Sequence, residues 1–325
     1  MKKVLAILLS LTLVLSLGAL LMSCDSDNPP VETPTDTNGQ PVVTQPNGET
    51  NSNNGNSGNS GNETPGTTAP TTITLTFNGT NLTSSVSDTG ITVEGNAFVI
   101  TRGGSYELKG DLSGGQIKVN VPKTEQVELI FNNFTALCNT SAPLYIASAD
   151  KCVIVLAAGS VNTLTDATLY QFADPTTDKP NACIYSSDDL TIKGDGTLNV
   201  NGNYNNGIGC KNDLRIKDCT LNVTGVNNII KGNDSVEIEN AKVTLSGGED
   251  AIKSDTEDRT DKGYILITAG SKVTIDCLDD AIQAFTSITI EAGATVTGNC
   301  GGNALNCPGT INADETAMQI VSPEA

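Results

Sequence analysis

The chain has 325 residues, a formal net charge of −19, no histidine, no tryptophan and 4% aromatic residues. An acidic excess of this size repels other polyanions at long range, so we expect no nucleic-acid partner. Because the chain has neither histidine nor a CxxC pair, the usual zinc-site spacings are also excluded.

Residues 1–23 have the pattern of an export signal. Lys2 and Lys3 precede an apolar run at 4–21, and the end of that run, "LMSC", resembles the lipobox of bacterial lipoproteins. The resemblance implies cleavage before Cys24 and attachment of lipid to its sulfur. The alternative is an ordinary secretory signal. We expect an exported bacterial lipoprotein, held on the membrane by Cys24 at the cell envelope or cell surface.

Residues 24–70 are rich in Asn, Gly, Ser, Thr and Pro, as in "NSNNGNSGNSGNETPGTTAP". Such a segment has too few apolar residues to offset chain entropy, and we expect it to be disordered. A random coil of this length spans roughly 35–40 Å root-mean-square. We interpret the segment as a linker between the lipid anchor and a folded domain.

Residues 71–325 are long enough for one domain, in which strand patterns dominate and no helical period is sustained. The chain has nine cysteines, and all except Cys24 fall in this domain. An exported chain permits disulfides, but the sequence does not define any pairing. We expect several of these thiols to be small buried hydrophobic groups.

From about residue 181 the chain is repetitive. The repeats align on one apolar position with steps of 24, 22, 22, 30 and 23 residues: Ile184, Ile208, Ile230, Ile252, Ile282 and Leu305. Each unit holds three short strand patterns, for example "CIY", "DLTI" and "TLNV" in the first unit. A near-constant period with three strands in each unit predicts a solenoid.

We therefore predict an all-β fold, a right-handed single-stranded parallel β-helix that forms a three-sided solenoid with about 22 residues per coil. The hand follows from the general crossover rule. Stacked coils would align two inward ladders, Leu190, Leu214, Val236, Ile265 and Ile288, and Ile192, Ile216, Ile238, Ile267 and Ile290. The alternative is an antiparallel sandwich, which does not require equally spaced units. We expect a monomer.

Paired acids recur at one position of the repeat. Glu249-Asp250 and Asp279-Asp280 stand where earlier units carry pairs of asparagine. Each pair alone fits a solvated turn, but equivalent positions on adjacent coils lie about 4.8 Å apart. Four carboxylates at that spacing repel unless a cation binds among them. Hard oxygen ligands without histidine favour Ca²⁺ as the cofactor.

The 30-residue step contains an acidic insertion, "DTEDRTDK", at 255–262. We include Asp255 and Asp258 among the candidate calcium ligands because the insertion follows the same corner. The insertion lacks the glycine and terminal glutamate spacing of an EF-hand loop. The alternative is a soluble acidic insertion with no ion.

Together, "DDLTIKGDGTLNVNGNYNNGI", "EDAIKS" and "DDAIQA" resemble a family of bacterial, surface-attached, calcium-binding β-helix carbohydrate-binding domains that are similar in fold to pectate lyases. The resemblance covers most of residues 71–325. It implies binding of acidic plant cell-wall polysaccharide, polygalacturonate (pectin) in particular, or of cellulose. The asparagine pairs at 205–206 and 227–228 depart from the acidic motif of that family.

The chain offers few aromatic platforms for neutral sugars, whereas calcium could bridge its acids to a sugar carboxylate. Lys231 and Lys253, which follow aligned isoleucines, and Tyr264 are the candidate ligand-binding residues. The leading interpretation is a non-catalytic binder of polysaccharide. One alternative is a lyase that uses Lys253 as the base in calcium-assisted β-elimination. The other is a structural adhesin, and a glycosidase ranks lower because adjacent acids in one turn do not straddle a sugar.

Overall fold

The computed structural model describes residues 71–172, 176 and 179–323. The expected signal peptide at 1–23, the lipidated Cys24 and the linker at 24–70 lie outside these residues. Within the part that the structure describes, no helix has both the length and the apolar character needed to cross a bilayer.

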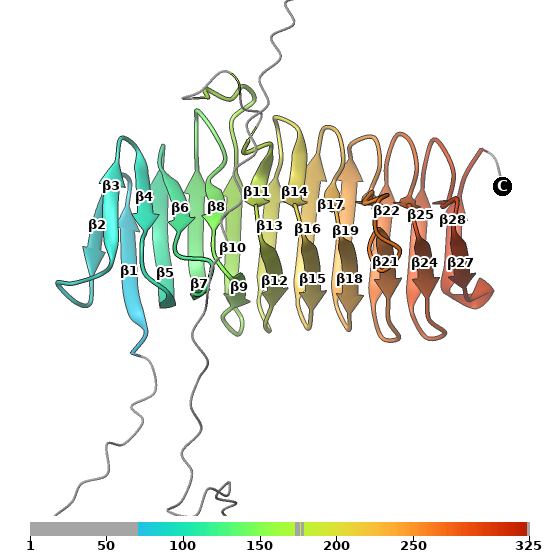
Figure 1. The fold of residues 1–325 in the computed structure, drawn as a ribbon, viewed down its shortest axis with the longest axis horizontal. Coiled ribbons are helices and arrows are strands. Elements are labelled where there is room, and N and C mark those ends of the chain that lie inside the picture. The colour runs from blue at the N-terminus through green and yellow to red at the C-terminus, as the bar shows by residue number, and fades with distance from the viewer. Residues whose placement is uncertain (1–70, 173–175, 177–178, 324–325) are drawn as a thin grey trace, which may run out of the picture. The chain divides into compact units, whose positions relative to one another are not determined.

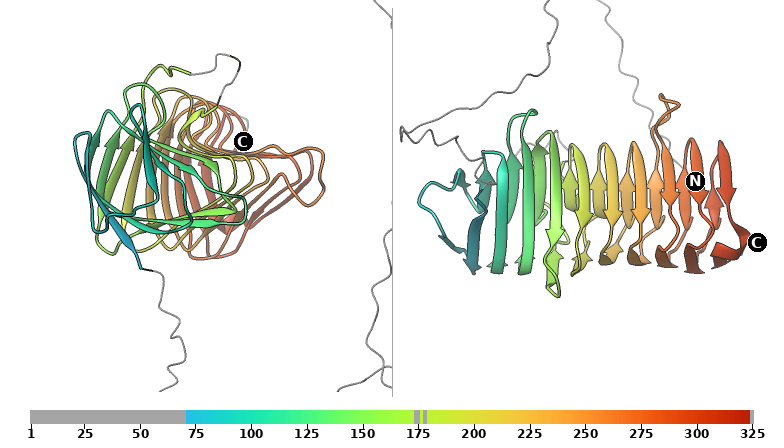
Figure 2. Two further views of the ribbon diagram at one scale, coloured as in Figure 1. Left: turned by 60° about the vertical axis from the view of Figure 1, so that its left-hand side comes forward. Right: turned by 90° about the horizontal axis from the view of Figure 1, so that it is seen from below.

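The described residues form coils that stack along one axis, and each regular coil contributes one strand to each of three faces (Figures 1 and 2). The first face is a separate sheet made of β3 (Ile91–Glu94), β4 (Ala97–Ile100), β6 (Gln116–Asn120), β8 (Leu144–Ser148), β11 (Ala182–Ser186), β14 (Asn206–Cys210), β17 (Ile230–Gly232), β20 (Ile252–Ser254), β23 (Ile282–Ala284) and β26 (Leu305–Asn306).

The second and third faces belong to one continuous sheet. The second face comprises β9 (Lys151–Leu156), β12 (Asp189–Lys193), β15 (Asp213–Lys217), β18 (Ser235–Glu239), β21 (Tyr264–Ile267), β24 (Ser287–Ile290) and β27 (Thr310–Ala313). The third face comprises β10 (Val161–Thr165), β13 (Thr197–Asn201), β16 (Thr220–Gly225), β19 (Lys242–Gly247), β22 (Lys272–Asp276), β25 (Thr295–Asn299) and β28 (Met318–Val321).

The two faces merge because the first strands are long. β7 (Gln126–Leu137) pairs with β9 along its first half and with β10 along its second half. On its other side lies β5 (Gly104–Ser113), which pairs with β1 (Ile73–Asn78). The antiparallel hairpins of β1 with β2 (Asn81–Ser84) and of β3 with β4 lie at the N-terminal end of the stack. A short 3₁₀ helix, η1 (Glu315–Ala317), precedes β28.

The repeat alignment is confirmed residue by residue. The strands of the first face pair in parallel with the aligned isoleucines opposite one another, from Ile184 to Leu305. Both predicted inward ladders are present on the second face. Strand β15 illustrates the cause, because Leu214 and Ile216 are buried while the charged residues between and beside them face outward. Parallel pairing across all three faces excludes the antiparallel sandwich; the right hand remains a prediction.

The thiols behave as predicted for small hydrophobic groups. Of the eight cysteines in the described residues, all are free, seven are buried and Cys307 is half-buried. Burial, with a smaller contribution from the charge of Cys210, raises the pKa of Cys152 to about 12. The fold therefore depends on apolar ladders and strand hydrogen bonds, with no disulfide among these cysteines.

Candidate functional site

A ladder of polar side chains runs along the corner that leads into the first face. We call it the corner ladder: Asn206, Asn228, Asp250, Asp280 and Asn303, each two residues before an aligned apolar residue. Asn228 donates from its backbone and side-chain nitrogens to Asn206 Oδ1, at 3.0 and 2.9 Å. Asn303 makes the same two bonds to Asp280 Oδ1, at 2.7 and 3.0 Å. In this ladder, side-chain oxygens of one coil accept hydrogen bonds from backbone N–H groups at the corner of the next coil.

Three acids converge where the corner ladder becomes acidic. Carboxylate oxygens of Asp250, Asp279 and Asp280 lie within 4.8 Å of one another, and we call these residues the acid cluster. Asp250 and Asp280 are buried, with 5% and 4% of their surfaces exposed, whereas Asp279 is exposed. Desolvation, followed by the charges of Asp280, Asp250 and Glu249, raises the pKa of Asp279 above its ordinary value. The cluster therefore holds more negative charge than its surroundings neutralise.

The described neighbours compensate the acid cluster only in part. Lys253 Nζ lies 2.8 Å from Asp250 Oδ2. Asp280 Oδ2 accepts hydrogen bonds from two neutral side-chain amides, Asn306 Nδ2 at 2.6 Å and Gln283 Nε2 at 3.3 Å. One ammonium thus faces three carboxylates, and amides add polarity but no charge.

The oxygens available at this corner fit a hard cation. Carboxylates and amide carbonyls are the ligands that Ca²⁺ takes, and no histidine or reactive thiolate competes with them. Asn228 adds a further oxygen on the coil next to Asp250. Its Oδ1 is buried and has no hydrogen-bond partner in the part of the chain that the structure describes. A buried oxygen without a donor is costly unless water or a ligand meets it.

Three further metal candidates lie outside the acid cluster. Glu249 is exposed next to Asp250 and contributes charge to Asp279. Asp255 is 2.6 Å from Lys231 and is therefore already paired. Asp258 is exposed on the insertion. The structure thus brings together three of the six acids chosen from the sequence.

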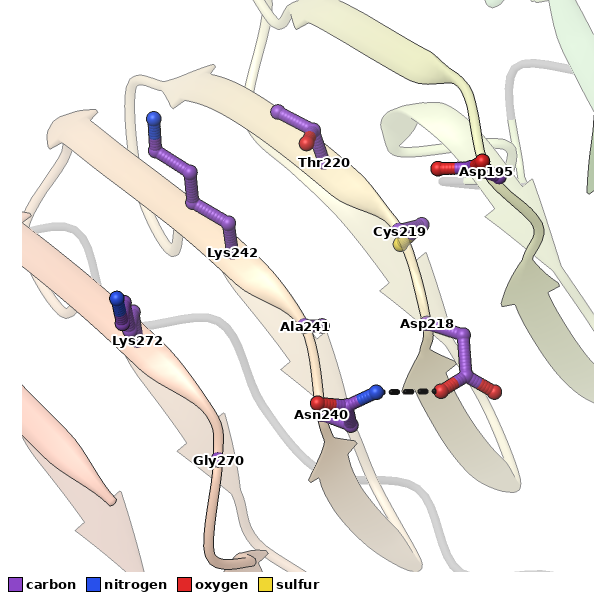
Figure 3. Close-up of a pocket in the computed structure, with 9 residues that line it drawn as sticks. All are labelled: Asp195, Asp218, Cys219, Thr220, Asn240, Ala241, Lys242, Gly270 and Lys272. Carbon is purple, nitrogen blue, oxygen red and sulfur yellow. Dashed lines mark hydrogen bonds between the residues drawn. The ribbon is translucent and has the colours of Figure 1, made fainter. Parts of the chain in front are cut away.

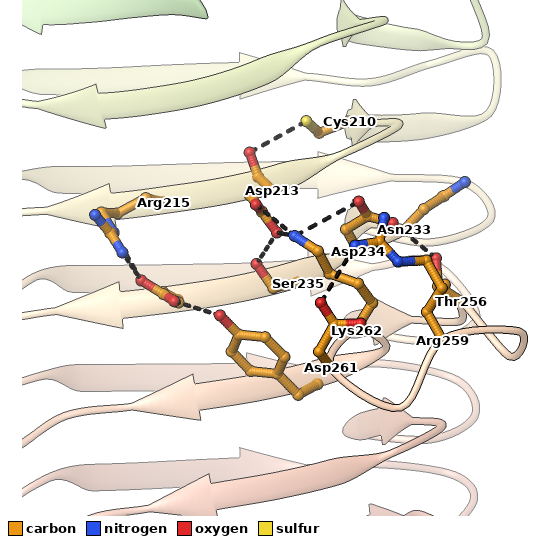
Figure 4. A network of polar contacts seen from close by, with 12 residues as sticks. Cys210, Asp213, Arg215, Asn233, Asp234, Ser235, Thr256, Arg259, Asp261 and Lys262 are labelled. Carbon is orange, nitrogen blue, oxygen red and sulfur yellow. Dashed lines mark hydrogen bonds and ion pairs between the residues drawn. The ribbon is translucent and has the colours of Figure 1, made fainter.

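The acidic insertion is tied back to the two preceding coils, as Figure 4 shows. Lys262 Nζ contacts both carboxylate oxygens of Asp213, at 2.9 and 2.8 Å, and lies 3.7 Å from Asp234. Thr256 Oγ1 donates to Asp234 Oδ1 at 3.0 Å. The insertion therefore carries its own basic partners. Across residues 71–172, 176 and 179–323, the acid cluster is the only group of three or more acids or cysteines with metal-ligand geometry.

The candidate ligand-binding residues do not share one surface. Lys231 and Lys253 are paired in register on β17 and β20, so they stack on the first face as predicted. Tyr264 begins β21 on the second face, and its hydroxyl donates to Glu237 Oε1 at 2.6 Å. The structure therefore separates Tyr264 from the two lysines.

Sequence reasoning missed the amides that hold the acid cluster. Asn303 and Asn306 belong to the last repeat unit, "GNALNC", which was aligned on Leu305 but carries no acid. Extending the corner position through that unit would have found Asn303 from the register alone. Gln283 and Asn306 also stand opposite each other on the first face.

A hollow of about 400 Å³ lies on another corner, between the second and third faces (Figure 3). Asn240 Nδ2 donates to Asp218 Oδ1 at 2.9 Å, and both residues have positive φ, of 45° and 51°. Lys242 and Lys272 stand in register beside this turn, opposed by Asp195 and Asp218 in the same lining. The two lysines balance the charge of the two aspartates, so this hollow selects neither anions nor cations. The hydrogen bond between Asn240 and Asp218 stabilises their left-handed turns.

Comparisons with known proteins agree with the architecture. Residues 94–324 match a family described as "Carbohydrate-binding domain-containing protein". A protein of that description from Acetivibrio thermocellus is 39% identical over 229 residues, which cover 70% of this chain and 79% of the relative. The solved structure of a polysaccharide lyase-like protein from C. thermocellum, a gadolinium derivative, is 38% identical with a TM-score of 0.74, and the match covers 77% of this chain and all of that one. The chain therefore belongs to the family of carbohydrate-binding domain-containing proteins and has the fold of a polysaccharide lyase-like protein.

Proposed function

We propose that this protein is a surface-anchored, non-catalytic binder of polysaccharide that depends on calcium. Its preferred ligand is an acidic plant cell-wall glycan of the polygalacturonate (pectin) type, with cellulose as a further ligand. The observation that carries the proposal is the acid cluster, in which Asp250, Asp279 and Asp280 bring carboxylate oxygens within 4.8 Å of one another.

The same three acids would hold the calcium ion, with Glu249 adding negative charge at the rim. Bound calcium supplies positive charge and open coordination positions for the carboxylate of a sugar. The stacked Lys231 and Lys253 extend from this corner along the first face and add basic groups beside the acids.

The contacts of Lys253 support binding over catalysis. A base for β-elimination needs a lone pair directed at the substrate, and the Lys253 ammonium is instead held 2.8 Å from Asp250. The lyase alternative is favoured by one finding, the likeness to a polysaccharide lyase-like structure. An absorbance assay for the unsaturated product of polygalacturonate, with and without a chelator, separates the two functions. Turnover that Lys253→Ala abolishes would establish the lyase instead.

We also propose that the mature protein is an exported lipoprotein. Cys24 would carry the lipid, and the segment at 24–70 would hold a monomeric solenoid away from the membrane. Metabolic labelling with a fatty-acid analogue tests this directly. Loss of the label in Cys24→Ser is the expected result, and a soluble, unlabelled wild-type protein would contradict the anchor.

Calcium-dependent retention by polygalacturonate in an affinity gel tests the binding function. We expect the double variant Asp250→Asn with Asp280→Asn to lose both calcium binding by calorimetry and calcium-dependent retention. Asp258→Asn removes one exposed charge outside the acid cluster and is the matched control. Calcium binding that survives unchanged in the double variant would refute the assignment. Wild-type protein that binds calcium but is never retained would instead favour the structural adhesin.

A further inference from the structure

A cavity of about 150 Å³ opens on the first face, before the acid cluster in chain order. Its charged lining residues are all lysines, Lys179, Lys211 and Lys231, and most of the other lining residues are asparagines. Among the lining residues that the structure describes there is no carboxylate, although the chain as a whole carries a net charge of −19. We call this feature the lysine–asparagine cavity. Lysine and asparagine side chains thus gather at one place on an acidic protein.

The cavity exists because one outward-facing position lacks a side chain. Gly209 on β14 stands in register between Tyr185 on β11 and Lys231 on β17. A Cβ at Gly209 would lie 3.1 Å from Ala182 Cβ and 3.5 Å from the Tyr185 ring. The φ angle of Gly209 is not in the left-handed region, so the backbone does not require glycine here. The missing side chain leaves a recess where the neighbouring coils carry large residues.

Lysines surround the recess, and Tyr185 in its lining is buried, with 2% of its surface exposed. Tyr185 lines it, and Lys179 Nζ lies 5.5 Å from the centre of the Tyr185 ring. Tyr145 packs against Tyr185 with ring centres 5.8 Å apart. Lys231 Nζ forms an ion pair with Asp255 Oδ2 at 2.6 Å, whereas Lys211 is exposed. Amide donors and acceptors beside an ammonium group are the combination that suits a sugar carrying a carboxylate.

We propose that the lysine–asparagine cavity binds one carboxylate-bearing sugar residue of the polysaccharide without a metal ion. Lys211 pairs with the carboxylate, and the asparagine amides meet the hydroxyl groups. The inference rests on the proposed polysaccharide binding and adds a second anionic subsite to it. Gly209 and Lys253 are two coils apart, about 10 Å at the ordinary strand spacing. One short oligosaccharide can therefore contact both the cavity and the corner that holds the acid cluster.

Calorimetry with trigalacturonate in excess chelator tests the cavity without calcium. We expect wild-type protein to bind, with affinity that falls as salt is raised, and the fully methyl-esterified trisaccharide not to bind. Gly209→Gln fills the recess and should abolish binding. Lys211→Ala removes a charge-assisted contact and should weaken binding about tenfold. Lys272→Ala, an exposed lysine on the third face, is the matched control and should change nothing.

The outcomes separate this inference from the proposed function. If Asp250→Asn with Asp280→Asn loses calcium-dependent retention but keeps binding in chelator, both proposals stand. If wild-type protein binds only with calcium, or if Lys211→Ala binds as tightly as wild type, the cavity is not a subsite. Gly209→Gln is interpreted only where its thermal unfolding matches wild type, and Lys211→Ala decides the question otherwise. Binding in chelator with no response to calcium would refute the calcium site and leave the cavity standing.

Discussion

Replacing Asp279 by asparagine isolates the repulsion within the acid cluster. Asp279 is exposed, and its carboxylate has ligand oxygens of Asp250 and Asp280 within 4.8 Å. At that distance one pair of charges in water repels by about 0.9 kcal/mol. Physiological salt reduces this by about half, because the Debye length is about 8 Å. Two neighbours therefore destabilise the folded state by about 1 kcal/mol at pH 7, and Asp279→Asn removes that cost.

The assay is thermal unfolding in chelator, where Asp279→Asn should melt about 2–4 °C above wild type for a unit of this size. The control is Asp258→Asn, which removes the same charge from the exposed insertion and should change the melting temperature little. Saturating calcium should cancel or reverse the advantage, because the variant loses a ligand while wild type gains about 2.7 kcal/mol at a hundredfold excess over the dissociation constant.

The stability difference between Asp279→Asn and wild type should depend on pH in a defined direction. The pKa of Asp279 is raised in the folded state, so the folded protein holds this proton more tightly than the unfolded chain does. Well below the unfolded-state pKa of about 3.9 the carboxyl is protonated in both states, and wild type and variant should be equally stable with respect to this group. The difference in unfolding free energy between Asp279→Asn and wild type should grow as pH rises through the folded-state pKa of Asp279. It should then stay constant to pH 7. A variant no more stable than Asp258→Asn in chelator, or a gap that closes with rising pH, would refute the repulsion.

Other predictions concern the stack itself. Ile216→Ala opens a cavity in a fully buried ladder and should cost about 2–5 kcal/mol in urea unfolding, and a cost below 1 kcal/mol would mean that the ladder repacks. Gly298→Ala should destabilise more than Gly79→Ala, because both have positive φ but a Cβ at Gly298 would lie 1.8 Å from the Ile275 carbonyl oxygen whereas Gly79 faces open space. Equal melting temperatures would contradict that comparison. In native protein, a thiol reagent should label Cys307 before any other cysteine of the described residues, and prompt labelling of a buried thiol would show local opening.

The sequence alone determined the solenoid, because its signal is periodic. Side chains that recur at a fixed step must stack, so the alignment of Ile208 with Ile230 and Ile252 also set the pairing register of three strands. The same register put Asp250 and Asp280 on adjacent coils. The 30-residue step did not disturb this, because the insertion leaves the coil after β20 and rejoins it before β21.

Only the tertiary structure decided which acids cluster and where a ligand has room. The insertion is not periodic, so its course depends on partners elsewhere: Lys262 ties it to Asp213 two coils earlier, and Asp255 pairs with Lys231. The face of the solenoid that a residue occupies likewise separates Tyr264 from the lysines. The recess at Gly209 has no sequence signature of its own, since a missing side chain makes a cavity only where its neighbours in space are large. Periodic positions can thus be read from the chain, whereas contacts of loops and the shape of hollows depend on groups brought together from different coils.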